Sequence, residues 1–186
     1  VGRGRQRPND DEAPIIPVNV FASFLGYYIA EGYCSSRQRG FISLAQTDDG
    51  IGSQPPRGFA ATMDTSIRAL AIAPVAARVR ETSGRRCWSF SLTHRGLAEW
   101  LTEHCGRRAT DKRLPREVFD WPAPAQRALL SALIDGDGSR DANGQIRYGS
   151  SSRQLVDDMQ QLCVQLGIAS SVSPAGRYWS LVIRPE

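Results

Sequence analysis

Hydrophobic residues recur along this chain at two spacings, one typical of helices and the other typical of strands. Helical spacing predicts helices over residues 19–31, 94–105 and 155–166, and from Pro122 or Pro124 to Asp137. Asn19 and Thr93 are the expected N-caps of the first two helices. Residues 66–82 also have a helix-like pattern, in which Pro74 must either kink the helix or mark a later start.

Alternation of apolar and polar residues predicts strands over residues 40–46, 86–92 and 145–149, and a closing strand that contains Trp179, Leu181 and Ile183. Residues 48–66 are rich in Gly, Pro, Asp and Thr, so we expect a long loop or an insertion there. Residues 1–18 combine Arg, Pro and an acidic run, and we expect an arm without a core of its own. Helices and mainly antiparallel strands in this order predict an α+β fold.

One helix end occurs twice in the chain. Residues 128–138 form an apolar helix pattern that ends in Asp and Gly, and residues 24–32 end in Glu and Gly. The glycine fits the left-handed residue that often closes a helix, so Gly138 is expected to have that conformation. Aligning the two glycines places small residues at equivalent positions four residues apart: Gly26 and Ala30 in the first helix, Ala132 and Gly136 in the second. Helices that meet through such residues can approach closely.

If the two helices pack together, Glu31 and Asp137 lie side by side at their C-terminal ends. The negative end of each helix dipole repels anions and favours a divalent cation with oxygen ligands. Two simpler interpretations compete with a metal site. A calcium-binding EF-hand fails, because it needs Gly and Glu where the chain has Arg140 and Ile146. An ordinary capped helix would explain one copy of the pattern, but nothing in turn chemistry demands a second.

These two segments resemble the motifs of the LAGLIDADG homing endonucleases, in the single-chain, two-motif form often found inside inteins. Residues 130–138 are similar to the motif itself, and residues 24–32 are similar to its divergent, Glu-ended version. Residues 111–115 and 148–155 resemble the segments that flank the second motif. The resemblance covers nearly the whole chain from about residue 18.

The resemblance implies an architecture of two αββαββα-like halves that pack through the motif helices, with their sheets forming a saddle over DNA. The expected boundaries are an arm over residues 1–18, a first half over 19–106, a linker over 107–123 and a second half over 124–186. Because one chain carries both motif helices, we expect a monomer.

The resemblance also implies the activity, which is that of a nuclease: a magnesium-dependent hydrolase that cuts both strands of a long, asymmetric double-stranded DNA target. Glu31 and Asp137 would bind Mg2+, with the backbone at Ala30 and Gly136 beside the ion. Mn2+ would substitute for Mg2+, and Ca2+ would bind without cleavage. The ion would act both as a Lewis acid and as a source of hydroxide near neutral pH.

Other residues of the site follow from the same resemblance. Lys112 matches a basic position that stabilises charge in the transition state, and Gln46 matches a polar position at a strand end. On each strand, the side opposite the apolar residues would face the DNA groove, where Arg, Gln and Ser can read base edges. Ordinary solvated strand faces are the alternative. The expected DNA contacts are Arg39, Ser43, Arg85, Ser89, Ser91, Gln145, Arg147, Ser151, Ser180 and Arg184.

Composition favours a polyanionic partner without identifying it. The net charge is +4, and 22 of the 23 basic residues are Arg, which suits contacts to phosphate and guanine; a coding bias towards Arg explains the skew equally well. Four separated cysteines and two histidines argue against a zinc site. No apolar run is long enough for a membrane span. We therefore expect a cytoplasmic protein, prokaryotic or phage-encoded, with no protein partner.

Two other functions belong to relatives of this architecture: RNA-splicing maturases, and regulators that bind DNA without cleaving it. The regulators have lost the two carboxylates, which are present here. A maturase stays open as an alternative. Intein splicing by this chain is not expected, because residue 1 is not a nucleophile and the chain does not end in His-Asn.

Overall fold

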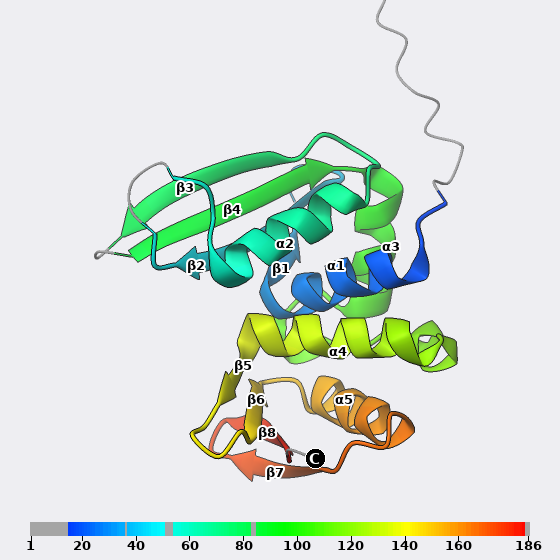
Figure 1. Ribbon diagram of the computed structural model, residues 1–186. Helices are drawn as coiled ribbons and strands as arrows, with labels where there is room; N and C mark the ends of the chain where they lie inside the picture. Colours follow the sequence, from blue (N-terminus) through cyan, green and yellow to red (C-terminus); the bar gives the residue numbers. More distant parts are fainter. Residues whose placement is uncertain (1–14, 36, 51–53, 83–84, 185–186) are drawn as a thin grey trace, which may run out of the picture.

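The computed structural model describes residues 15–35, 37–50, 54–82 and 85–184 (Figure 1). The first half contains α1 (Val18–Glu31), β1 (Gly32–Cys34), β2 (Phe41–Asp48), α2 (Gly58–Ala69), β3 (Ala76–Thr82), β4 (Arg85–Thr93) and α3 (Arg95–Cys105). The second contains α4 (Ala123–Asp137), β5 (Gly138–Arg140), β6 (Ile146–Ser150), α5 (Arg153–Gln165), β7 (Ser170–Ala175) and β8 (Tyr178–Ile183). The described residues thus form five α-helices and two four-stranded antiparallel sheets, which confirms the α+β prediction.

The two sheets have the same topology and the same register. Their strand orders are β1-β2-β4-β3 and β5-β6-β8-β7. In the first sheet Gly32 pairs with Leu44, which pairs with Phe90; in the second Gly138 pairs with Tyr148, which pairs with Leu181. Each position of one sheet therefore has a defined counterpart in the other. The internal repeat extends from the motif helices into the strands.

Helices α1 and α4 lie side by side between the two sheets (Figure 1). Helix α1 is buried on every side, at Ala22, Phe24, Leu25, Gly26, Tyr27, Tyr28 and Ile29. A helix that is apolar all round belongs in the middle of a core, and here α4 covers one side while β2 and α2 cover others. The motif helices are therefore the centre of the protein, and no described helix is both long and apolar enough to cross a membrane.

Helix α5 and the longer strands agree with the sequence pattern. The apolar face predicted for α5 is buried at Leu155, Val156, Met159, Leu162, Cys163 and Leu166. Ser152 caps this helix, because its hydroxyl accepts a hydrogen bond from the N–H of Leu155. On β4, Trp88, Phe90 and Leu92 alternate as buried residues.

The sequence predictions for residues 48–82 were wrong. Residues 58–66 belong to helix α2 and not to a loop, and residues 76–82 form strand β3 and not a helix. Ala, Arg and Glu are common on β3 and favour helices, but seven residue pairs with β4 override that preference. Pro74 neither kinks nor starts a helix; it lies in the connection between α2 and β3.

Three predictions about helix ends were also wrong. Helix α1 begins after Pro17, which places Asn19 inside the helix. The N-cap of α3 is His94 and not Thr93, because the Nδ1 atom of His94 accepts the N–H of Leu97. Gly138 is extended, with φ −86°, and not left-handed, because the chain passes directly from α4 into β5.

Residues 107–123 connect the halves and pack as part of the core. They contain two short 3-10 helices, at Ala109–Asp111 and Arg116–Asp120. Leu114 and Val118 are buried. The carboxylate of Asp158 on α5 accepts the N–H of Leu114 at 2.9 Å, so the linker is anchored to the second half. The predicted arm over residues 1–18 lies outside the described residues up to residue 14.

Candidate active site

Small residues let α1 and α4 touch at two successive levels. A Cβ atom added to Gly26 would lie 2.6 Å from the Cβ of Ala132, and one added to Gly136 would lie 2.5 Å from the Cβ of Ala30. Real Cβ atoms do not approach so closely, so only one methyl group fits at each level. Each contact joins two positions that are equivalent in the repeat. The pseudo-twofold axis therefore passes between these residues, and the two helix C-termini converge.

Glycines also turn each helix into the strand that follows it. A Cβ atom on Gly32 would lie 2.5 Å from the Tyr28 ring, and one on Gly138 would lie 2.5 Å from the carbonyl oxygen of Ile134. Both glycines are extended, so close packing and not a left-handed backbone requires them. The turns fix Glu31 and Asp137 as the last residues of α1 and α4.

The two carboxylates influence each other. Partial burial, followed by the charge of Asp137, raises the pKa of Glu31 to about 7. The side chain of Asp137 is more exposed, yet loss of water around its carboxyl still raises its pKa, and the charge of Lys112 opposes that rise. The site therefore concentrates negative charge that water does not fully screen.

Lys112 lies at the end of α1, near this pair. Its side chain is buried, and its Nζ atom donates to the carbonyl oxygens of Tyr28, at 3.3 Å, and Gly32, at 3.0 Å. The same ammonium lies 4.5 Å from the centre of the Tyr28 ring. Burial lowers the pKa of Lys112. Lys112 thus holds the C-terminus of α1 in place and supplies a positive charge close to Asp137.

Tyr148 is a residue of the site that the sequence did not single out. It is 1% exposed on β6, and burial, then the charges of Asp137 and Glu31, raise the pKa of its hydroxyl. Its counterpart in the first sheet is Leu44, so the hydroxyl has no equivalent there. Aligning the strands that follow the two motifs would have shown a tyrosine where the first copy has a leucine.

Gln46 lies two residues beyond Leu44 on β2, and Leu44 pairs with Gly32. This register brings Gln46 to the level of the α1 C-terminus. It is on the same side of the sheet as Leu44, and its Oε1 atom accepts the N–H of Thr47 at 2.8 Å. The corresponding position in the second half is Ser150.

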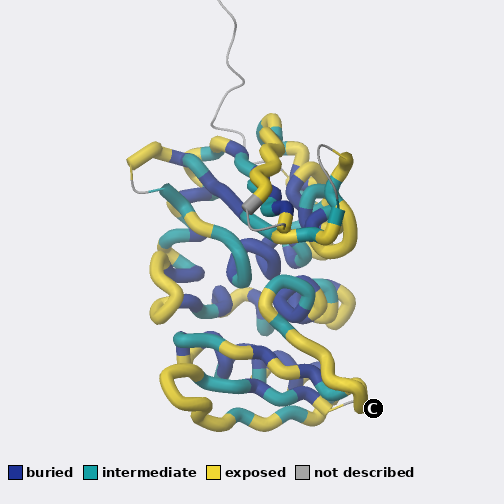
Figure 2. Tube along the Cα trace, turned by 90° about the vertical axis from the view of Figure 1, so that its left-hand side faces the viewer, coloured by how far each residue is buried: buried dark blue, intermediate teal, exposed yellow. Residues whose placement is uncertain are grey.

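We call the side of each sheet turned away from the helices its outward face. Figure 2 views the protein from the side on which the motif helices end, with a sheet on either side of them. Among the expected DNA contacts, Arg85, Arg147 and Arg184 are exposed, whereas Ser89, Ser91, Gln145, Ser151 and Ser180 are half-buried. The expectation of an accessible Ser43 was wrong: it is on the outward face but is 5% exposed, between Tyr33 and Ser91 on the neighbouring strands.

The remaining expected contact, Arg39, lies in the turn after β1. Its guanidinium is 3.5 Å from the carboxylate of Glu99 on α3. Both side chains are exposed, so this ion pair is weak and leaves Arg39 able to change partner.

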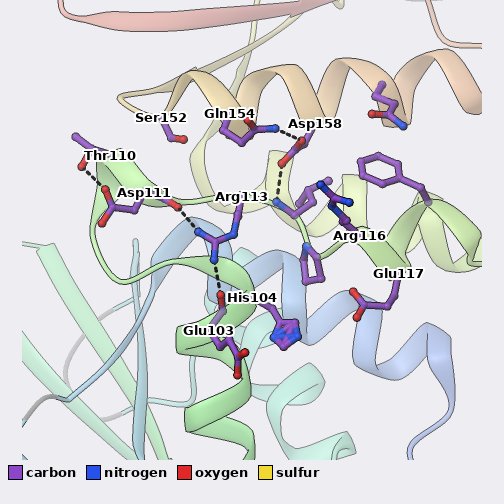
Figure 3. A pocket seen from close by; sticks show the side chains of 14 residues that line it. Glu103, His104, Thr110, Asp111, Arg113, Arg116, Glu117, Ser152, Gln154 and Asp158 are labelled. Atoms are coloured by element: carbon purple, nitrogen blue, oxygen red, sulfur yellow. Dashed lines mark hydrogen bonds between the residues drawn. The ribbon is translucent and has the colours of Figure 1, made fainter.

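An open hollow of about 980 Å3 lies elsewhere, between the end of α3 and the start of α5. Figure 3 shows the linker crossing it, with Arg113 donating to the carbonyl oxygens of Asp111 and Glu103. Asp158 contacts the linker from the other side. Its lining includes neither Glu31 nor Asp137. The hollow is where the linker ties the two halves together, and we assign it no role in catalysis.

The donors at the carboxylate pair fit a hard divalent cation. Among the described residues no cluster of three or more His, Cys, Asp or Glu side chains occurs, so soft-metal sites and all-protein cages do not apply. Mg2+ is commonly held by one or two carboxylates together with substrate phosphates and water. The carbonyl groups of Ala30 and Gly136 belong to last helical turns, which lack intrahelical donors.

The raised pKa of Glu31 makes a prediction for the metal-free protein. Because its folded-state pKa of about 7 exceeds the ordinary value of 4.5, the folded protein binds more protons between these pH values, and its stability falls as pH rises through this window. After allowance for partial screening, Glu31→Gln should stabilise the fold by about 1 kcal/mol at pH 8, or about 2–4 °C in Tm. Asp137→Asn should gain less, because Lys112 already stabilises that charge.

Thermal melts in EDTA at pH 8 and pH 5 check this. The wild type and Glu31→Gln should differ at pH 8 and converge towards pH 5, where Glu31 is protonated. A lower Tm for Glu31→Gln at pH 8 would show that the carboxylate is a structural cap.

Comparison with known proteins places this geometry. Residues 124–183, from α4 to β8, match the family described as LAGLIDADG-like domain. A DNA gyrase of Mycolicibacterium flavescens is 30% identical over 161 residues, which cover 80% of this chain and 26% of that protein. DNA polymerase of Thermococcus aggregans is 26% identical over 156 residues, which cover 81% of this chain and 8% of that protein. The chain therefore spans about a quarter or less of these two relatives.

Solved structures agree on the fold. I-DmoI in complex with DNA and Mn has a TM-score of 0.59 at 13% identity, with 89% of each chain covered. Full-length DUF199/WhiA from Thermatoga maritima has a TM-score of 0.60 at 13% identity, covering 93% of this chain and 53% of that one. At this identity the similarity establishes the LAGLIDADG fold and nothing finer.

Proposed function

We propose that this chain is a homing endonuclease of the intein type, which makes a metal-dependent double-strand cut in a long DNA target. The observation that carries the proposal is the convergence of Glu31 and Asp137 from equivalent helix ends. Two like charges about 4 Å apart at an effective dielectric of about 20 repel by roughly 4 kcal/mol, so a pair placed in this way is a cost to the fold unless it binds a cation. A divalent ion between two DNA strands is the use that the repeat suggests.

The range of relatives supports an inserted module. Stretches similar to this chain occur within proteins as different as a DNA gyrase, a DNA polymerase and the SufBD family protein ML0593 of Mycobacterium leprae, the last at 32% identity over 82 residues. Each of these proteins is far longer than the matching stretch. A module shared by unrelated hosts is what an intein-borne endonuclease would leave, and this is our reason for proposing that type.

Glu31 and Asp137, with the carbonyl oxygens of Ala30 and Gly136, would hold the Mg2+ ion. When bound, such an ion supplies a Lewis acid and lowers the pKa of a water molecule. Crystals of I-DmoI with DNA are described with Mn and with Ca, which supports Mn2+ as a substitute and Ca2+ as a candidate for binding without cleavage. The residues of this chain orient the phosphodiester, present two carboxylates to the ion, and place Lys112 where negative charge develops.

Lys112 allows a separate prediction. Lys112→Met removes the charge that opposes the raised pKa of Asp137, so this carboxyl should ionise at higher pH and the acid limb of the pH–rate profile should move up. The cleavage rate at pH 7 should fall roughly 100-fold. Lys112→Arg keeps the charge and should retain the wild-type profile. A Lys112→Met profile that overlies the wild type would show that Lys112 acts only by holding α1.

A second candidate is a protein of the same fold that binds DNA without cutting it. The equal similarity to WhiA and to I-DmoI favours keeping it, because the fold does not separate the two functions. A maturase that binds RNA is a third candidate that the fold equally allows. Both motif helices lie in this one chain, so for each candidate we propose a monomer.

A cleavage assay on a randomised DNA library tests the proposal. With Mg2+, we expect cut ends that share one long, asymmetric sequence, and with Ca2+ we expect binding without new ends. Retention of duplex DNA without cleavage in Mg2+ or Mn2+ would instead support the DNA-binding protein. Preference for structured RNA over duplex DNA, again without a cut, would support the maturase.

A further inference from the structure

Strand β3 places two arginines on the outward face of the first sheet. Arg78 pairs with Ser89 on β4, and Arg80 pairs with Cys87. The alternating residues Ala77, Val79 and Glu81 belong to the opposite face. Both arginines are exposed, and the ion pairs among the described residues involve neither of them. Two free cations thus stand on the face that we propose lies against DNA.

The register fixes the level of these arginines relative to the carboxylates. Ser89 pairs with Ala45, which follows Leu44, the partner of Gly32. Arg78 is therefore level with the end of α1, about three strand spacings from β1, or about 14 Å. Arg80 lies about 7 Å further, beyond the level of Glu31 and in the direction opposite to that of β1. Arg85 continues the same outward row towards the β3–β4 turn.

The second sheet has its cations elsewhere. By register, the counterparts of Arg78 and Arg80 are Ser173 and Ala175, which carry no charge. The arginines of that outward face are Arg147, which pairs with Ser139, and Arg184, whose N–H continues the strand pairing to Ala169. Both lie past Gly138 in the direction of the β5–β6 turn, away from Asp137.

The arginine positions of the second sheet are neutral in the first. The counterparts of Arg147 and Arg184 are Ser43 and Thr93. The two basic clusters therefore lie on opposite sides of the carboxylate level within their own sheets. The folds of the halves are related by the repeat, but their charges are not.

We infer that the two halves grip their DNA half-sites at unequal distances from the cut, with Arg78 and Arg80 as anchors of the first half-site. Arginine binds phosphate and guanine bidentately, and an exposed, unpaired guanidinium loses little on transfer to either. The inference rests on the proposed DNA-binding function. It adds Arg78 and Arg80 to the interface and makes that interface asymmetric in position as well as in residue type.

Salt titrations on a nonspecific duplex of about 40 base pairs, with Ca2+ present, test the anchors without knowledge of the target. Each phosphate contact contributes about 0.9 to the slope of log affinity against log salt concentration, so Arg78→Gln/Arg80→Gln should make the slope shallower by almost 2. Arg68→Gln/Arg95→Gln is the matched control: it removes two charges that lie on α2 and α3 in ion pairs. Its slope should equal that of the wild type, and all three proteins should melt at similar temperatures.

Hydroxyl-radical footprints on a selected target then test the positions. Arg78→Gln/Arg80→Gln should lose protection in one half-site only, and Arg147→Gln/Arg184→Gln in the other, at a different distance from the cut. A wild-type slope for Arg78→Gln/Arg80→Gln, or losses at equal distances, would overturn this inference alone. A wild-type protein that does not bind duplex DNA would overturn the proposed function, and the inference with it.

Discussion

Glu31→Gln and Asp137→Asn should each abolish double-strand cleavage, by roughly 1,000-fold or more, while DNA binding in Ca2+ changes little. Each substitution keeps the shape of the side chain and removes the charge that would attract the metal ion. A single carboxylate at the junction of two helix C-termini holds a divalent cation poorly, so neither residue can replace the other. Rates on a selected target, measured at saturating Mg2+, give the size of the loss.

Asp135→Asn is the matched control for this experiment. Asp135 lies in the same turn of α4 as Asp137, but its carboxylate accepts a hydrogen bond from the Tyr27 hydroxyl at 3.3 Å, and an asparagine can still accept it. We expect cleavage within about tenfold of the wild type. Equal losses for Asp135→Asn and Asp137→Asn would show that a negative turn, and not a specific pair, is what matters.

The helix interface supports the second large effect. Gly136→Ala adds a methyl group where the Cβ of Ala30 already lies 2.5 Å away, so α1 and α4 must separate. Overpacking of this kind costs about 1–3 kcal/mol, or roughly 2–12 °C in Tm, and it also moves the two carboxylates apart. Cleavage should fall more steeply than stability, because the site depends on the convergence of the helix ends.

A swap variant separates packing from other effects. Ala30→Gly/Gly136→Ala again leaves a single methyl group at this level of the interface, now on the other helix. We expect it to recover most of the stability and cleavage that Gly136→Ala loses; the helix propensities of the two changes offset each other. Failure of the swap to recover either property would mean that the two residues do not share one contact.

The motif helices could be predicted from the sequence because their spacing is local and occurs twice. Gly26, Ala30, Ala132 and Gly136 stand four residues apart within each helix, and a close helix pair is the simplest use of such spacing. The same reasoning brought Lys112 to the site only through resemblance, since its contact with the Tyr28 carbonyl spans 84 residues of sequence.

Strand β3 shows what the sequence did not contain. Its residues favour a helix locally, and the strand exists because β4 offers seven partners. Since Arg78 and Arg80 were assigned to a helix, the outward face of the first sheet was missing its strongest charges. Tyr148 was overlooked for a related reason: its place beside the carboxylates depends on pairing between β5 and β6, which no local pattern reveals.

Mn2+ binding measured by electron paramagnetic resonance, with the protein bound to duplex DNA, tests the central claim most directly. The wild type, Glu31→Gln, Asp137→Asn and the double variant should be compared. If the two carboxylates share a site, each single variant should lose most of the tight Mn2+ binding, and the double variant should lose little more. Tight Mn2+ binding retained in the double variant, or independent losses that add, would contradict a site built by Glu31 and Asp137 together.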